Sequence, residues 1–214
     1  GGFGISRFKL DNALYELGKA SGVSFLLKTK VLEVKQTQRG FLIKTDKAGE
    51  LSAKVCIGTY GKRSNLDHSL NRAFFKKRSP YVGIKYHLRT DVHPQQQIAL
   101  HNFAEGYCGI SRIEDDKFCL CYLTTRKNLK ASGNIPTMEK DILQKNPFLR
   151  QIFFQSEFVF EQPFANNEIS FEPKPLIEEG ILMCGDTAGM IAPLCGNGMA
   201  MAIHSAKILS ELVG

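Results

Sequence analysis

The sequence predicts an α/β fold in which an antiparallel sheet is inserted between the two halves of a second unit. Three observations support this class. Residues 181–184 form a short apolar run typical of a buried strand, and a loop of small residues and a long apolar helix follow it. Residues 5–57 begin with a helical pattern and continue with strand patterns. Between about residues 80 and 164, strand-like runs alternate with polar turns, as in an antiparallel sheet.

The N-terminal part contains one helix and several strands. Leu10, Leu14 and Leu17 recur at helical spacing and predict a helix over residues 5–21, with Ser6 as its N-cap. We predict that Gly22 ends it. The strands expected after it cover residues 23–27, 30–35, 41–46 and 51–57, the last two joined by a turn that contains Gly49.

The middle of the chain is expected to form the inserted sheet. Its predicted strands cover residues 82–88, 97–103, 106–113 and 117–124. Thr137 is a good N-cap for a helix over 137–145, and Pro147 prevents that helix from continuing. A second short helix over 147–155 and a strand over 157–162 then lead toward the last part of the chain.

Composition limits the classes of protein to which this chain can belong. Of its 214 residues 43% are hydrophobic and 23% charged, as in globular proteins. No run of eighteen apolar residues predicts a transmembrane helix, and the first residues lack the pattern of a secretory signal. The net charge is +7, but the basic residues are scattered, so we expect no nucleic-acid partner. Attraction to cofactor phosphates or to an anionic membrane surface would explain this charge, and so would a solvated surface without a partner. The sequence does not indicate an oligomeric state.

The six cysteines lie in apolar, strand-like runs. Their spacing matches neither a zinc site nor a dense disulfide framework. Cys119 and Cys121 would point to one face of a strand and could form a metal pair, but reduced core cysteines explain the pattern better. We therefore predict no metal site and a cytoplasmic location.

The most informative segment follows the strand at residues 181–184. Gly185 and Asp186 come directly after it, and Gly196, Asn197 and Gly198 open the last helix. An ionised carboxylate accepts hydrogen bonds from sugar-like hydroxyls, and glycines let the backbone approach a ligand closely. The free amides of a helix N-terminus favour a ligand that becomes anionic on reduction. Together these features indicate a flavin site, although an ordinary strand–turn–helix unit would also explain the glycines.

The same segment resembles flavin adenine dinucleotide (FAD) enzymes of the para-hydroxybenzoate hydroxylase and geranylgeranyl reductase type. Their second fingerprint is Gly-Asp-small-small-Gly, then a proline, then Gly-x-Gly opening a helix with small residues along one face. The matching positions are Gly185, Asp186, Thr187, Ala188, Gly189, Pro193, Gly196, Gly198, Ala202 and Ala206.

The resemblance implies roles for individual residues and an arrangement of domains. Asp186, after Gly185, would bind the ribityl hydroxyls, and Pro193 would lie near the isoalloxazine ring. The pyrimidine edge of the ring would face the amides around four residues, Gly196, Asn197, Gly198 and Met199. Arg7 would lie beside the cofactor, and Val31 would flank the adenine. The implied FAD-binding domain, partial and Rossmann-like, covers residues 1–78 and 166–214, and the inserted substrate domain covers 79–165.

One part of the resembled enzymes is absent from these residues. Their first β-α-β unit carries GxGxxG, whose helix N-terminus binds the pyrophosphate. No such motif occurs in residues 1–214. The resemblance places it upstream, in a segment of about 80 to 100 residues. We therefore expect these 214 residues alone to bind FAD weakly or not at all and to be inactive.

Two departures from the family pattern bear on function. Hydroxylases of this type carry an Asp-Gly pair that serves cofactor and nicotinamide binding, whereas this chain has Tyr60 before Gly61. That difference weakens the case for hydroxylase-type use of NAD(P)H, which stays a candidate electron donor. The chain also lacks tryptophan, whereas the signature of flavin-dependent halogenases contains two. We therefore do not expect a halogenase.

The sequence identifies no catalytic side chain, because a bound flavin itself would perform the electron transfer. His101 and Tyr107 are candidates for contact with substrate. Apolar side chains of the predicted sheet would line an apolar pocket or simply form the core of the sheet: Phe103, Ile110, Phe118, Leu120 and Tyr122.

These observations lead to a functional hypothesis and two alternatives. The hypothesis is an FAD-dependent oxidoreductase that reduces double bonds of an isoprenoid or other lipid-like substrate. The first alternative is a flavin monooxygenase that hydroxylates an aromatic or polyketide-like substrate. The second is a non-catalytic electron carrier or binding module derived from a flavoprotein.

Overall fold

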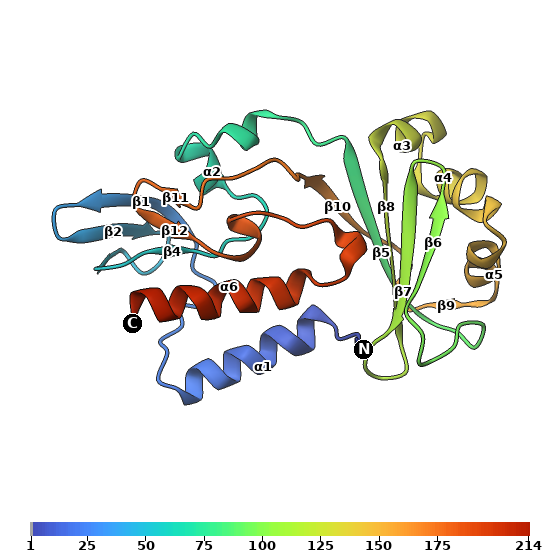
Figure 1. Ribbon diagram of the computed structural model, residues 1–214, viewed down its shortest axis with the longest axis horizontal. Coiled ribbons are helices and arrows are strands. Elements are labelled where there is room, and N and C mark those ends of the chain that lie inside the picture. The colour runs from blue at the N-terminus through green and yellow to red at the C-terminus, as the bar shows by residue number, and fades with distance from the viewer. Residues whose placement is uncertain (1) are drawn as a thin grey trace. The chain divides into compact units, whose positions relative to one another are not determined.

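The computed structural model describes residues 2–214, and the chain divides into two compact units (Figure 1). The first unit comprises Ser79–Ile169 together with the N-terminal residues up to Val23. The second comprises Ser24–Arg78 and Ser170–Gly214. The predicted α/β class, with an antiparallel sheet inserted between the two segments of another unit, is confirmed. The boundaries at residues 78 and 165 stay a prediction.

The first unit is built on one antiparallel sheet. Its strands follow the order β10 (Phe164–Ile169), β5 (Tyr81–Arg89), β8 (Phe118–Thr125), β7 (Gly106–Arg112) and β6 (Ala99–Phe103), and β9 (Glu157–Phe158) also pairs with β5. In β5 and β8 every second side chain is buried, the alternation expected for a sheet with one covered face.

Short helices cover that face (Figure 1). They are α3 (Arg126–Ser132), α4 (Ile135–Asp141), the 3₁₀ turn η2 (Leu143–Lys145) and α5 (Pro147–Gln155). The buried core joins sheet residues such as Ile84 and Leu120 to Met138 and Leu149 of the helices. The predicted Thr137 N-cap is wrong, because Asn134 caps α4 one turn earlier and accepts a hydrogen bond from the Thr137 amide.

The N-terminal helix α1 (Arg7–Ala20) begins where the sequence predicts. The Ser6 hydroxyl accepts a hydrogen bond from the Lys9 amide at 3.2 Å, which satisfies a donor that the helix leaves open. Glu114, in the loop after β7, accepts a hydrogen bond from the Ser6 amide at 2.9 Å. This segment is therefore joined to the sheet of its own unit by the cap residue.

The second unit contains two small sheets. One is antiparallel, in the order β1 (Val31–Thr37), β2 (Gly40–Thr45) and β3 (Glu50–Ala53). The other has the order β11 (Ile177–Glu178), β12 (Ile181–Met183) and β4 (Ile57–Gly58), and its β12–β4 pair is parallel. The remaining elements are α2 (Asn65–Ser69), η1 (Ala73–Lys76), η3 (Gly185–Thr187), η4 (Pro193–Cys195) and α6 (Gly198–Val213).

Phe41, Ile181 and Met183 form the buried core of the second unit. The predicted strand over 23–27 is wrong: this apolar run pairs with no strand, and Val23, Leu26 and Leu27 are exposed. Pairing depends on partners distant in sequence, so an apolar run alone does not define a strand. Among the described residues, no helix has the length and apolar character needed to cross a bilayer.

Candidate functional site

The Gly-Asp segment forms the turn η3 between β12 and α6. Gly185 has a φ of 60°, a left-handed conformation that glycine adopts without steric cost. Its amide donates to the Ser205 hydroxyl of α6 at 3.2 Å, and a Cβ at this position would lie 3.5 Å from Ala202 Cβ. The turn therefore packs against the first turns of α6, as the strand–turn–helix prediction requires.

The second predicted part of the site is the exposed turn that leads into α6. Pro193 opens η4, and Gly196 follows with a φ of 65°. A Cβ at Gly196 or Gly198 would meet no atom of the described residues within 4 Å. Asn197 precedes the helix, but its side chain makes no capping hydrogen bond. The first amides of α6, at Gly198 and Met199, therefore lack an intrahelical acceptor.

The side chain of Asp186 is not used in the hydrogen bonds that hold the turn together. Its backbone carbonyl is hydrogen-bonded, but within residues 2–214 its partly exposed carboxylate accepts no hydrogen bond and forms no ion pair. Such a carboxylate can accept from ligand hydroxyls without first breaking a bond within the protein. The chemistry of this carboxylate and of the free amides at the start of α6 suits the hydroxyls and the reduced ring of a cofactor such as FAD.

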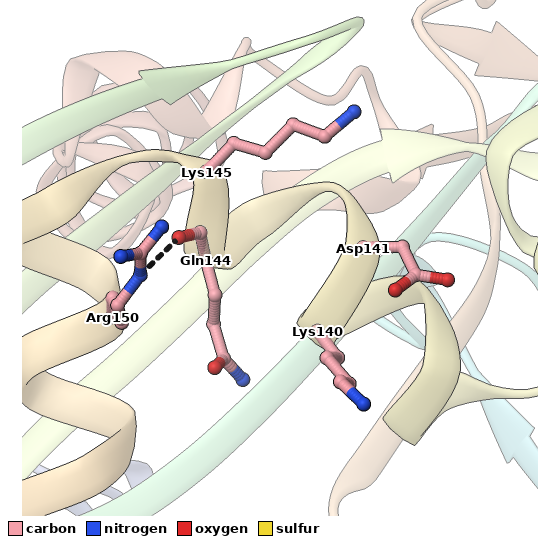
Figure 2. A pocket seen from close by; sticks show the side chains of 5 residues that line it. All are labelled: Lys140, Asp141, Gln144, Lys145 and Arg150. Carbon is pink, nitrogen blue, oxygen red and sulfur yellow. Dashed lines mark hydrogen bonds between the residues drawn. The ribbon is translucent and has the colours of Figure 1, made fainter.

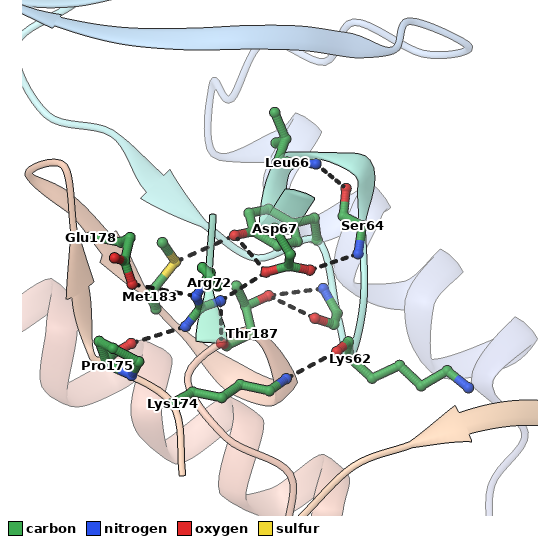
Figure 3. Close-up of polar contacts among 12 residues, drawn as sticks. Lys62, Ser64, Leu66, Asp67, Arg72, Lys174, Pro175, Glu178, Met183 and Thr187 are labelled. Atoms are coloured by element: carbon green, nitrogen blue, oxygen red, sulfur yellow. Dashed lines mark hydrogen bonds and ion pairs between the residues drawn. The ribbon is translucent and has the colours of Figure 1, made fainter. Parts of the chain in front are cut away.

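A buried polar network lies behind the Gly-Asp turn (Figure 3). Arg72 is 1% exposed, and its guanidinium donates to the Asp67 carboxylate at 2.9 Å. The same group donates to the backbone carbonyls of Thr187 at 3.1 Å and Pro175 at 3.0 Å. Its Nε lies 3.6 Å from a carboxylate oxygen of Glu178. Arg72 thus joins α2, β11 and η3 through one side chain.

Lys174 is a second buried cation in this network, with 8% of its surface exposed. Its ammonium donates to the carbonyls of Lys62 and Asp186, both at 2.9 Å, and lies 4.2 Å from the centre of the Phe74 ring. Burial lowers the pKa of Lys174 and Arg72 adds to that shift, whereas the charges of the Asp67 and Asp186 carboxylates oppose it. The protein therefore places two positive charges beneath one short turn.

The loop at residues 58–64 is joined to the same turn. The Thr187 hydroxyl donates to the Gly61 carbonyl at 3.1 Å and accepts from the Gly61 amide at 2.9 Å. The Tyr60 hydroxyl donates to Asp67 at 3.2 Å. Burial first, and then the Asp67 charge, raises the pKa of Tyr60 to about 12. The tyrosine at this position is thus part of a buried network.

The remaining predicted cofactor residues lie in different units. Val31 begins β1 in the second unit, together with Gly185 and the residues that follow it. Arg7 begins α1 in the first unit, where its exposed guanidinium makes two hydrogen bonds to Asp11 at 2.9 and 3.1 Å. Their contact with a cofactor stays a prediction.

The two candidate substrate residues occupy opposite faces of the sheet. His101 pairs with the fully buried Cys108 and stacks on Phe148 of α5, with ring centres 5.6 Å apart, on the helix-covered face. Burial, with His93 nearby, lowers the pKa of His101. Tyr107 is adjacent to Cys108 in β7 and therefore points to the other face. These two side chains do not line one cavity.

The apolar side chains that the sequence offered as a pocket wall form the core instead. Five of them are buried or packed against the helices: Phe103, Ile110, Phe118, Leu120 and Tyr122. Within residues 2–214, no group of three or more histidine, cysteine or acidic side chains is placed to hold a metal ion. Cys119 and Cys121 are both free thiols.

A cavity of about 520 Å³ lies on the helical layer of the first unit (Figure 2). Its lining consists of Lys140, Asp141, Gln144, Lys145 and Arg150. Figure 2 shows the two lysines pointing in different directions, while the Arg150 Nε donates to the Gln144 carbonyl at 3.0 Å. None of the predicted site residues lines this cavity, and its polar groups do not converge on one point.

Sequence reasoning did not identify the buried network. One part has a sequence signal, since Ser64 and Asp67 form a capping box at the start of α2. Lys174 and Arg72 have none, because part of their contacts is made to residues 112 and 115 positions away, Lys62 and Thr187. Their nearer partners, Asp186 at twelve positions and Asp67 at five, do not mark either cation as buried.

Comparison with known proteins identifies the fold. No protein-family model matches the chain. The flavin-dependent halogenase CmlS is similar over 94% of this chain, with a TM-score of 0.80 and 16% identity. A flavoprotein/dehydrogenase from Cytophaga hutchinsonii is similar over 95%, with a TM-score of 0.77 and 16% identity. The myxobacterial chondrochloren halogenase CndH, an FAD-dependent halogenase, is similar over 96%, with a TM-score of 0.75 and 17% identity.

The chain covers 38%, 52% and 50% of these three proteins, respectively, and so spans about half of their length or less. At such low identity the similarity establishes the fold and does not transfer an activity. This chain therefore has the fold of part of the FAD-dependent flavoproteins.

Proposed function

We propose that this chain is part of an FAD-dependent oxidoreductase of the monooxygenase type, acting on a small apolar or aromatic molecule. The observation that carries the proposal is the partly exposed Asp186 carboxylate, which accepts no hydrogen bond within residues 2–214 and belongs to a turn packed against the helix that an exposed glycine turn opens. The fold supports the cofactor class, since flavin-dependent halogenases and a flavoprotein/dehydrogenase share it. The halogenases among these similar proteins favour monooxygenase-type chemistry over reduction of lipid double bonds.

The roles of the residues follow from their chemistry. Asp186 would accept hydrogen bonds from the ribityl hydroxyls, and the amides at Gly198 and Met199 would donate to the ring. Bound FAD would supply electron transfer, while the protein binds it, orients it and excludes water. Halogenation itself is not proposed, because residues 1–214 contain no tryptophan.

A second candidate, reduction of a carbon–carbon double bond, is favoured by one observation. Tyr60 stands where hydroxylases of this type carry aspartate, and its hydroxyl is hydrogen-bonded to the buried Asp67. That arrangement leaves no aspartate at this position for a nicotinamide donor, so NAD(P)H stays a candidate donor only.

Reoxidation of the reduced full-length protein distinguishes the two candidates. The protein is loaded with FAD, reduced without oxygen, and mixed either with oxygen plus candidate aromatic substrates or with isoprenoid alkenes. Substrate-stimulated reoxidation by oxygen is expected for the monooxygenase. Reoxidation by the alkene without oxygen would identify a reductase instead. A full-length protein that binds no FAD would contradict the proposal altogether.

A further inference from the structure

We infer that Lys174 and Arg72 are positioning residues for the cofactor-binding carboxylate: they hold the backbone carbonyls of Asp186 and Thr187 and thereby orient the Asp186 side chain. The inference rests on the proposed FAD site and adds to it a pair of residues that do not contact the cofactor themselves. It concerns the second unit alone, to which all these residues belong.

The two cations bind successive peptide groups of one turn. Figure 3 shows one of these contacts, from Arg72 to Thr187. The Lys174 ammonium donates to the Asp186 carbonyl, and the Arg72 guanidinium donates to the Thr187 carbonyl. On the other side of the turn, the Gly185 amide donates to Ser205. Backbone groups on both sides of the Asp186 side chain are therefore fixed, and the carboxylate itself stays available.

Burial of the Lys174 ammonium group costs free energy, and this cost indicates a specific structural role for the residue. Removing an ammonium group from water is costly unless the protein replaces its hydrogen bonds. Lys174 makes its two hydrogen bonds, at 2.9 Å each, to backbone carbonyls and none to a carboxylate. A well-packed apolar side chain would avoid this cost, so we infer that Lys174 is kept for the position that it imposes on Asp186.

Arg72, unlike Lys174, forms a hydrogen-bonded ion pair with a buried carboxylate. Asp67, itself 1% exposed, neutralises it, and Tyr60 and the Ser64 amide bind the same carboxylate at 3.2 and 2.7 Å. Two of the groups that bind Arg72, the Asp67 carboxylate and residue Thr187, are thus held in turn by further hydrogen bonds. Such support is what keeps a binding group within the narrow geometry that its ligand requires.

A double-mutant cycle on FAD affinity tests the inference. Full-length apoprotein is titrated with FAD by flavin fluorescence for the wild type, Lys174→Met, Asp186→Asn and the combination of the two. Losing a charged hydrogen-bond donor should raise the Kd of Lys174→Met about tenfold. If Lys174 acts through Asp186, adding Lys174→Met to Asp186→Asn should change the Kd less than about twofold, because coupled residues are not additive.

Two controls separate positioning from loss of stability. Lys77→Met removes an exposed lysine, paired with Glu172, from the same unit and should leave the Kd unchanged. Phe41→Leu weakens the core of this unit and should lower thermal stability without changing the Kd. If Lys174→Met does not fold, Lys174→Gln, which keeps one donor, replaces it in the cycle.

The outcomes of these titrations test the positioning role of Lys174 separately from the proposed FAD-dependent function. Full additivity, or a Kd for Lys174→Met within about twofold of the wild type, would overturn the positioning role while leaving the FAD site intact. A wild-type protein that binds no FAD would overturn the proposed function itself.

Discussion

Asp67 is the carboxylate on which the buried polar network of the second unit depends. One of its oxygens accepts from Arg72 and Tyr60, and the other accepts from the Ser64 amide. Both oxygens are thus occupied in a site with 1% exposure. A buried carboxylate of this kind is stable only while its cation and donors stay in place.

This network explains why aspartate would not be tolerated at position 60. We predict that Tyr60→Asp lowers the free energy of unfolding by about 3 kcal/mol or more, since it removes a packed ring and places a second carboxylate beside Asp67. Tyr60→Phe, which loses only the hydroxyl, should cost about 1 kcal/mol. Urea denaturation of both variants measures the two values. Equal losses would contradict the charge-repulsion argument.

Helix α4 is joined to the sheet of the first unit through one buried carboxylate. Glu139 Oε1 accepts hydrogen bonds from the Tyr86 and Tyr122 hydroxyls, at 2.8 and 2.7 Å. Burial raises the pKa of Glu139, and the two phenolic hydrogen bonds oppose that shift. Burial also raises the pKa values of Tyr86 and Tyr122, to which the nearby carboxylate contributes. Folding therefore moves the titration of the Glu139 carboxyl group to higher pH.

The raised pKa predicts a specific dependence of stability on pH. A group whose folded pKa lies above its ordinary value, here 4.5, stabilises fully below that value and loses this contribution as pH rises through the folded pKa. Glu139→Gln cannot ionise, so its stability relative to the wild type should increase as pH rises above 4.5. Urea unfolding of both proteins between about pH 4 and 8 measures this difference. A constant difference would contradict the prediction.

The N-terminus of α1 depends on a carboxylate with the opposite shift. Desolvation of Glu114 opposes its ionisation, but hydrogen bonding from Ser6 outweighs it and lowers the pKa of Glu114 to about 2. A depressed pKa stabilises above the ordinary value of 4.5, and this contribution is lost as pH falls through about 2. The link between α1 and the sheet should therefore weaken in acid.

We expect Glu114→Gln to speed hydrogen exchange of the first-turn amides of α1 at pH 7, because a neutral amide is a weaker acceptor for the Ser6 N–H. The destabilisation relative to the wild type should shrink between pH 4.5 and about 2, where the native carboxylate is itself protonated. Glu16→Gln, on the exposed side of the same helix, is the matched control. Similar exchange in both variants would rule out the role assigned to Glu114.

The two units together account for about half or less of the flavoproteins that share this fold. The second unit contains the Gly-Asp turn and the helix N-terminus that we propose for the flavin end of FAD. Residues 1–214 contain no GxGxxG turn for its pyrophosphate. The pyrophosphate is therefore expected to add little to the affinity of residues 1–214 for FAD.

We predict that residues 1–214 bind FAD and riboflavin with dissociation constants within about tenfold of each other, since these residues contain no GxGxxG turn for the pyrophosphate of FAD. Flavin fluorescence titration measures both affinities. A purified 214-residue protein that carries stoichiometric FAD would contradict this prediction.

Local sequence determined those parts of the fold that depend on neighbouring residues. Ser6 caps α1, Pro147 opens α5, and a glycine turn precedes α6, as the sequence predicts. The order of short strands also predicts the inserted antiparallel sheet. Each of these features rests on interactions within a few residues, which leave a readable pattern.

Only the tertiary structure decided which side chains surround the candidate site. It placed His101 and Tyr107 on opposite faces of one sheet, and it brought Arg72 and Lys174 beneath the Gly-Asp turn. These contacts join residues distant in the chain, and a buried cation has no spacing that marks it in advance. The sequence thus determined the turn that presents Asp186, whereas the packed fold determined what holds that turn in place.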